Sequence, residues 1–280
     1  MAVQGFNKST AKSYIYYISD FLKYSNKSPR DISANDIIKF LEEMVRQKKS
    51  RSTLNSAHSA FKFYFEKILG RKFFSPKGRI ARAKLQKNPP VFLTEKEISK
   101  LLANIKRVKY KLIFKLMSES GLRISETINL RLEDMDFENK IVKIKKAEKK
   151  SLRKRALGRK VKILPETSHN IKKFTLDHKK SDFIFTNQKG GKLTERAIQK
   201  TFLASLKKSN IYKPATCNSL RHSFAFGLAK EGLSQEKIRE ILGHKLKESS
   251  KIYINIKNDV KIKRKIQNLI YASVPRSRRD

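Results

Sequence analysis

Two arginines and a tyrosine, far apart in the sequence, carry the side chains needed to cut a phosphodiester bond. Arg123 lies in a Gly-Leu-Arg-Ile-Ser-Glu run, Arg221 in a Ser-Leu-Arg-His run, and Tyr253 nine residues after a Leu-Gly-His run. Two guanidinium groups can hold the non-bridging oxygens of a phosphate through their fixed forks of donors. A tyrosine oxygen can then attack the phosphorus and hold the cut strand covalently. This combination predicts a phosphodiester-cutting site around Tyr253, with a buried core tyrosine as the alternative.

Three further side chains beside these residues are candidates for supporting roles. Glu126 follows Arg123 by about one helical turn, so it can orient a guanidinium. His244 follows a glycine at a predicted helix end, where a neutral imidazole can exchange a proton near neutral pH. His222 falls on the apolar side of its predicted helix, which favours packing or support.

The charge of the chain predicts a polyanionic partner. Lysine and arginine number 66 against 25 aspartates and glutamates, which gives a net charge of +41. Such a charge neutralises backbone phosphates and releases counterions, so binding to nucleic acid should be strong and salt-dependent. Lysine-rich surfaces are also typical of thermophiles, and this is an alternative source of part of the excess.

Length and cysteine usage limit the class of protein. The chain has 280 residues, 39% of them hydrophobic, enough for one large core or two modest ones. One cysteine, Cys217, cannot form an intrachain disulfide or a cysteine metal cluster, so we expect no metal and no cofactor. No apolar run approaches the roughly 18 residues of a membrane span, and residues 1–10 do not resemble a signal peptide. We therefore expect a soluble, cytoplasmic protein associated with the nucleoid.

The first part of the chain reads as a helical domain. Apolar residues recur at helical spacing over 14–22, 37–45 and 54–68, and Gly70 follows the last of these segments. This pattern predicts an all-helical domain over residues 1–75. The cations and hydroxyls between its second and third helices could contact DNA phosphates, with a solvated turn as the alternative; they are Lys48, Lys49, Arg51 and Ser52.

A basic linker is predicted over residues 76–91, where periodicity gives way to proline, glycine and cations, including the candidate DNA contact Arg79. Thr94 and Glu97 form a capping-box pattern that opens a second domain over residues 92–256. Residues 257–280 read as a short amphipathic helix and a basic tail.

Inside the second domain the hydrophobic period changes. Residues 141–144 and 160–164 alternate apolar with cationic, as two half-buried strands do, and residues 182–185 read as a third strand. Helices are expected over 110–117, 123–130, 194–206, 220–230 and 235–242, with Arg123 and Arg221 each at the start of one. The predicted fold is mainly α with a small antiparallel sheet: a helical N-terminal domain and an α+β C-terminal catalytic domain.

The order and spacing of these runs over nearly the whole chain resemble the tyrosine recombinase, or phage integrase, family, above all its short Xer-type members. The resemblance implies that Arg123, Arg221, His244 and Tyr253 are catalytic and that a 3′-phosphotyrosyl link forms without ATP. It also implies double-stranded DNA as partner, a C-terminal segment that packs on a neighbouring protomer, and a tetramer on two DNA sites.

The chain departs from the family pattern at two places. Asn218 stands where the family usually has histidine or lysine; its amide can contact a phosphate but cannot exchange a proton at neutral pH. The alternative role for Asn218 is a helix N-cap. In the basic turn after residue 144 the usual glycines are missing, and we assign Lys146 as the acid for the leaving oxygen, with Lys145, Lys149 and Lys150 as competitors. Lys149 and Lys150 are also candidate DNA contacts.

The prediction is a site-specific DNA recombinase, with Xer-type resolution of chromosome or plasmid dimers favoured over an integrase or excisionase of a mobile element. Three other classes share some of these features. They are a type IB topoisomerase, a DNA-binding module that has lost catalysis, and a basic nucleic-acid chaperone.

Overall fold

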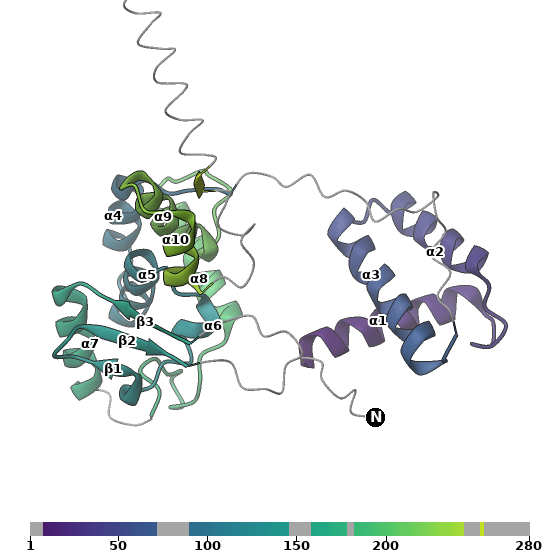
Figure 1. Cartoon of the computed structure of the whole chain (residues 1–280), viewed down its shortest axis with the longest axis horizontal. Helices are drawn as coiled ribbons and strands as arrows, with labels where there is room; N and C mark the ends of the chain where they lie inside the picture. Colours follow the sequence, from purple (N-terminus) through teal and green to yellow (C-terminus); the bar gives the residue numbers. More distant parts are fainter. Residues whose placement is uncertain (1–7, 72–89, 146–157, 178–181, 244–252, 255–280) are drawn as a thin grey trace, which may run out of the picture. The chain divides into compact units, whose positions relative to one another are not determined.

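The chain forms two compact units that divide between Asn88 and Pro89. The computed structural model describes residues 8–71, 90–145, 158–177, 182–243 and 253–254. Residues 8–71 belong to the first unit and the other described ranges to the second (Figure 1).

The first unit is helical, as predicted. It contains α1 (Lys8–Ser25), α2 (Ala34–Arg46), α3 (Arg51–Phe63) and the π-helical turn η1 (Tyr64–Ile68). Ser33 and Asp36 form a capping box that fixes the start of α2, and the Ser50 hydroxyl accepts from the Thr53 amide at the start of α3. Each helix buries one apolar face against the other two. Rings from the three helices meet with centroids 4.9–5.8 Å apart at the centre of this core: Phe21, Phe40 and Phe61.

The second unit combines seven α-helices in the described residues with one small sheet. Its helices are α4 (Glu95–Ala103), α5 (Val108–Ser120), α6 (Ile124–Thr127), α7 (Pro165–Asp177), α8 (Glu195–Lys208), α9 (Cys217–Lys230) and α10 (Gln235–Leu242). The predicted capping box of Thr94 and Glu97 is present at the start of α4. A 3-10 turn, η2 (Leu132–Asp134), leads into the sheet.

The sheet is antiparallel with strand order β1 (Met135–Asp136), β2 (Ile141–Ile144) and β3 (Arg159–Lys162). Val142 pairs with Val161 at its centre, and Ile144 pairs with Arg159 at its end. Val142, Ile144 and Val161 are buried and belong to the same hydrophobic core as α5 and α7. The sheet therefore packs against the helical body of the unit, and β3 contacts α10 (Figure 1).

Helix α5 lies at the centre of the second unit. Six of its thirteen residues are buried, among them Phe114, whose ring meets that of Phe202 on α8 edge-on at 5.4 Å. A separate apolar cluster joins α9, α10 and Tyr253 through Ala225, Ile238 and Leu242. Since α5 also packs along α9, the C-terminal end of α5 is held beside both clusters.

The predicted fold class is confirmed, but several elements differ. Residues 182–185 form only an isolated bridge, Arg131 with Phe183, and the third strand is instead the two-residue β1. Helix α6 has four residues rather than the predicted 123–130, and α7 was not predicted. None of the helices in the described ranges is long and apolar enough to cross a membrane.

Candidate active site

Gly121 fixes the position of Arg123 at the end of α5. It ends that helix in the left-handed conformation, with φ of 63°, and a Cβ there would lie 2.5 Å from a ring carbon of Phe224. Only glycine fits both the backbone and the space. The chain then turns so that Arg123 becomes the N-cap of α6, with its amide and its Nη1 each 2.8 Å from the Glu126 carboxylate.

Arg221 reaches the same place from α9. Its side chain is 5% exposed, and its guanidinium donates to the carbonyl oxygens of Gly121 at 2.5 Å and Leu242 at 2.6 Å. Burial, followed by the positive charge of Arg123, lowers the pKa of Arg221 to about 9, so it remains charged at neutral pH. Arg221 is the fifth residue of α9 and not its first, so the prediction that a helix start holds it is wrong.

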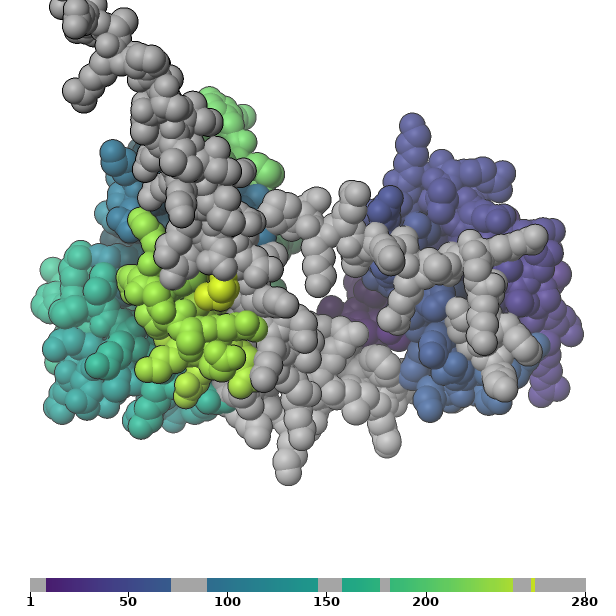
Figure 2. All heavy atoms as spheres, turned by 45° about the horizontal axis from the view of Figure 1, so that its top comes forward, coloured from purple at the N-terminus to yellow at the C-terminus, as the bar shows by residue number. Residues whose placement is uncertain are grey.

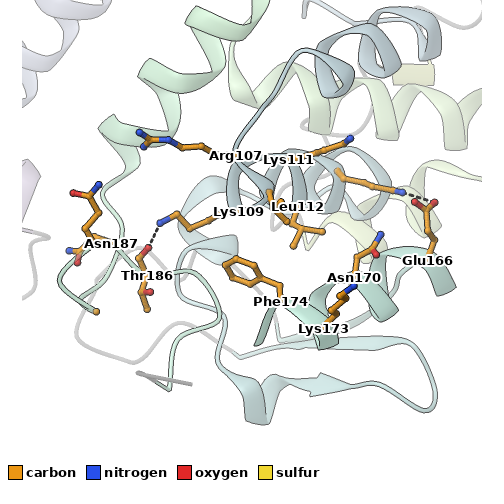
Figure 3. Close-up of a pocket in the computed structure, with 14 residues that line it drawn as sticks. Arg107, Lys109, Lys111, Leu112, Glu166, Asn170, Lys173, Phe174, Thr186 and Asn187 are labelled. Atoms are coloured by element: carbon orange, nitrogen blue, oxygen red, sulfur yellow. Dashed lines mark hydrogen bonds and ion pairs between the residues drawn. The ribbon is translucent and has the colours of Figure 1, made fainter. Parts of the chain in front are cut away.

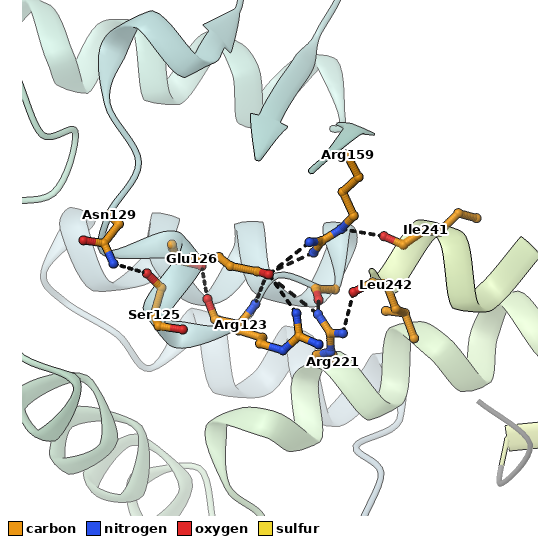
Figure 4. Close-up of polar contacts among 10 residues, drawn as sticks. Arg123, Ser125, Glu126, Asn129, Arg159, Arg221, Ile241 and Leu242 are labelled. Atoms are coloured by element: carbon orange, nitrogen blue, oxygen red, sulfur yellow. Dashed lines mark hydrogen bonds and ion pairs between the residues drawn. The ribbon is translucent and has the colours of Figure 1, made fainter. Parts of the chain in front are cut away.

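Glu126 holds the guanidiniums together. One carboxylate oxygen lies 2.8 Å from Arg123 Nη1, and the other lies 3.8 Å from Arg221 Nη1 (Figure 4). A third guanidinium, that of Arg159, donates to both oxygens at 3.0 and 2.9 Å. Burial raises the pKa of Glu126, but the hydrogen bonds and charge of Arg159 and Arg123 outweigh it and lower the pKa to about 2. The carboxylate is therefore ionised across the physiological range.

Arg159 was not among the predicted site residues, although its position in the strand contains a signal. Side chains at alternate positions share one face of a strand, so Arg159 shares a face with Val161 and Ile163, both buried. An arginine on an apolar face needs a carboxylate partner. The pattern therefore indicated a buried ion pair, but the sequence could not identify Glu126 as its partner.

Tyr253 lies against α9 and α10 with 2% of its surface exposed. Its hydroxyl oxygen lies 2.9 Å from His222 Nδ1. Burial raises the pKa of Tyr253, and the charges of Arg221 and Arg123 oppose this rise. Burial and the charge of Arg221 lower the pKa of His222, so its imidazole is neutral at pH 7. A neutral imidazole can accept the proton that the tyrosine must lose to become a nucleophile.

Comparison with known proteins identifies the group to which this arrangement belongs. The sequence model of the phage integrase family matches residues 91–259, and the model of the phage integrase N-terminal SAM-like domain matches residues 1–73. The chain belongs to the phage integrase family. Like the other tyrosine recombinases of that family, it is an enzyme that cleaves and rejoins DNA, and its activity is site-specific recombination.

The recombinase is similar to named members of the family along most of its length. It is 30% identical to tyrosine recombinase XerA of Pyrococcus furiosus and 28% identical to that of Pyrococcus horikoshii, in both cases over 91% of this chain and 86% of the relative. Among solved structures, XerH bound to a palindromic difH substrate matches 92% of this chain and 79% of its own, with a TM-score of 0.74 and 20% identity. That likeness shows a shared fold.

Two predicted catalytic residues of the recombinase, Lys146 and His244, lie outside the described residues, as do Arg79, Lys149 and Lys150. Lys145, a competitor of Lys146, is described; its ammonium binds Glu133 at 2.5 Å and Asp134 at 3.2 Å. The structure thus gives Lys145 acidic partners of its own.

Asn218 is exposed in the first turn of α9, three residues before Arg221. The two residues therefore occupy neighbouring positions on one face of the helix. The alternative role of Asn218 as N-cap is wrong. Thr216 occupies that position, and its amide donates to the Ser219 hydroxyl at 3.1 Å.

A cavity of about 950 Å³ lies at the other end of α5, between that helix, α7 and residues 186–190 (Figure 3). Its walls are cationic, with Arg107, Lys109, Lys111, Lys115 and Lys173. Lys115 is paired with Glu166 at 2.7 Å, and Lys109 donates to the Thr186 carbonyl at 2.5 Å. None of the predicted catalytic residues that the structure describes lines it, so this cavity is separate from the arginine cluster.

Proposed function

We propose that the recombinase cuts double-stranded DNA with Tyr253 as nucleophile and Arg123 and Arg221 as the phosphate-binding residues, in a Xer-type role. The observation that carries this proposal is a tyrosine hydroxyl that is hydrogen-bonded to a neutral imidazole and whose pKa is affected by the charges of both Arg221 and Arg123. Three chain segments more than 30 residues apart build this arrangement. Solved structures of relatives bound to DNA, including XerH with difH, support DNA as the substrate.

The proposed reaction exchanges one phosphodiester for another. Tyr253 Oη forms a bond to phosphorus while its proton passes to His222 Nδ1, and the bond from phosphorus to the 5′ oxygen breaks. The leaving oxygen takes a proton, for which Lys146 remains our proposed acid. Arg123 and Arg221 stabilise the charge that builds on the non-bridging oxygens. A 5′ hydroxyl of the partner strand then reverses these steps, so no ATP is consumed.

The first unit is proposed to hold the duplex near the cleavage site. Its candidate contacts are all exposed, at the junction of α2 and α3: Lys48, Lys49, Arg51 and Ser52. Lys48 has a positive φ of 56°, and Ser50 caps α3, so a turn of fixed geometry presents these cations. Residues 1–75 would then be the core-binding domain, 76–91 a linker, 92–256 the catalytic domain, and 257–280 a segment exchanged within a tetramer.

The Xer-type role is supported by the similarity of the chain to XerA relatives over most of both lengths. Such a role places the protein at the nucleoid. Selection of bound fragments from genomic DNA, followed by cleavage of the selected site in a nicked duplex, tests it. One chromosomal site outside any mobile element supports dimer resolution, whereas recovery of element ends supports an integrase. Relaxation of a plasmid that lacks the selected site would indicate a topoisomerase instead.

A further inference from the structure

Arg159 is bound more completely than either of the arginines proposed to hold the phosphate. Its side chain is 6% exposed. Three of its N–H groups are committed: Nη1 and Nη2 donate to the two oxygens of Glu126, and Nε donates to the Ile241 carbonyl at 2.7 Å. The parallel bonds to one carboxylate leave this guanidinium little freedom to turn toward DNA.

The charges around Glu126 show what this binding achieves. One carboxylate stands among three guanidiniums, and its distance to Arg221, 3.8 Å, is longer than its distances to Arg123 and Arg159. If Arg159 were absent, the oxygen that it holds would be free to approach Arg221. A carboxylate bound to Arg221 would compete with the substrate phosphate for the same donors.

We infer that Arg159 is a positioning residue for DNA cleavage: it binds Glu126 so that this carboxylate orients Arg123 without neutralising Arg221. The inference rests on the proposed function, since it concerns the same phosphate site. It assigns Arg159 no contact with the substrate.

The position of Arg159 gives it a second connection. It is the first residue of β3 and is paired with Ile144, the last residue of β2. Through Ile241 it also holds the C-terminal end of α10, just before His244. One side chain thus connects Glu126 to the last turn of α10, and its backbone pairs with the last residue of β2.

The test compares Arg159→Ala, Arg159→Lys, Glu126→Gln and the double variant Arg159→Ala/Glu126→Gln in the full chain. Single-turnover cleavage of a nicked duplex, duplex affinity and melting temperature are measured for each. Lys162→Ala is the matched control, because it removes an exposed positive charge from the same strand. Wild-type protein must form the covalent adduct. If it forms none, that result counts against the proposed function and not against this inference.

We expect Arg159→Ala to lower cleavage about a hundredfold, the scale of a small displacement of catalytic groups, with duplex affinity unchanged. Arg159→Lys should remain impaired, because an ammonium cannot make the two parallel bonds. In the double variant, the uncharged amide no longer competes for Arg221, so cleavage should recover at least in part from the Arg159→Ala level. Glu126→Gln can also restore stability, because it removes the charge of a buried carboxylate that has lost its partner. The melting temperatures therefore show which variants are folded at the assay temperature, and recovery of cleavage among folded variants separates positioning from general stability.

Three results would overturn the inference. The first is a folded Arg159→Ala or Arg159→Lys protein that cleaves at the wild-type rate. The second is a double variant whose fold-loss of cleavage equals the product of the fold-losses of the two single variants, which would indicate that the two residues act independently. The third is an equal loss of cleavage in Lys162→Ala, which would show that the rate follows net charge alone.

Discussion

His222 Nδ1 lies 2.9 Å from the hydroxyl oxygen of Tyr253, so the proposed nucleophile already has a hydrogen-bond partner that can take its proton. The sequence suggested only a supporting or packing role for His222. The contact joins α9 to residue 253, segments that are 31 residues apart in the chain.

This contact predicts a pH dependence of cleavage. Burial and the charge of Arg221 lower the pKa of His222 below its ordinary value of 6.5. The His222 imidazole is therefore almost entirely in its neutral, proton-accepting form at neutral pH. Cleavage should fall as the pH drops below that lowered pKa. A pH profile of single-turnover cleavage checks this, with His222→Gln as the control that should be slower and lack the acidic limb. An identical limb in His222→Gln would assign the titration to another group.

The same pKa shift predicts an effect on stability. A histidine that is neutral when folded and protonated when unfolded takes up protons on unfolding. Its contribution to folding stability is complete above the unfolded pKa, near 6.5, and is lost as the pH falls from there through the lowered pKa of the folded state. Melting temperatures of wild type and His222→Gln should differ in slope between pH 7 and 5. Parallel slopes would contradict the shift.

Arg123→Ala and Arg221→Ala should each lower cleavage at least about a hundredfold, because each removes one preorganised donor to the transition state. Their stabilities should differ. The Arg123 side chain is 29% exposed, whereas Arg221 is buried and donates to two carbonyl oxygens, so Arg221→Ala should also cost roughly 1–3 kcal/mol. Duplex affinity should change little for both. Losses of affinity as large as the losses of cleavage would show that these arginines only hold DNA.

Gly243→Ala should impair both stability and cleavage. Gly243 ends α10 with φ of 62°, and a Cβ there would lie 3.0 Å from Arg159 Nη1. We expect a loss of about 1 kcal/mol from the backbone alone, together with slower cleavage through displacement of Arg159. Gly227→Ala is the matched control, since that glycine lies within α9 with open space around it and should tolerate a methyl group. Thermal melting and adduct formation for both variants decide the matter.

Asn218 variants test the departure from the family pattern. Because Thr216 caps α9, Asn218→Ala should leave the melting temperature nearly unchanged. If the amide contacts phosphate, Asn218→Ala should slow cleavage and Asn218→His should maintain or raise it. Asn218→Asp should be slower than Asn218→Ala, because it places a negative charge beside the phosphate. A fully active aspartate variant would remove Asn218 from the site.

Local patterns in the sequence predicted much of the fold. The capping box at Thr94 and the period of two in residues 141–144 fix their own elements through neighbours in the chain. Helix α7 was missed because few of its residues follow an apolar stripe. The apolar run at 183–185 reflects burial of Ile184 and Phe185 in the core of the second unit, while only Phe183 makes an isolated bridge.

The candidate site was predicted less completely, because its contacts join distant segments. Arg123 and Glu126 are neighbours on one turn, and their pairing was expected. The bonds of Arg159 to Glu126 and of His222 to Tyr253 span 33 and 31 residues, and they depend on how β3 and α9 pack. No local pattern specifies such contacts.

Covalent capture of DNA tests the central claim most directly. A nicked duplex containing the selected site is incubated with wild type and Tyr253→Phe, and denaturing gels report protein linked to DNA. Wild type should give an adduct that survives denaturation and vanishes on proteolysis, whereas Tyr253→Phe should give none while it binds the duplex with nearly the same affinity, since only the nucleophilic oxygen is lost. An adduct formed by Tyr253→Phe would contradict the assignment, and Tyr271 would then be the next tyrosine to replace.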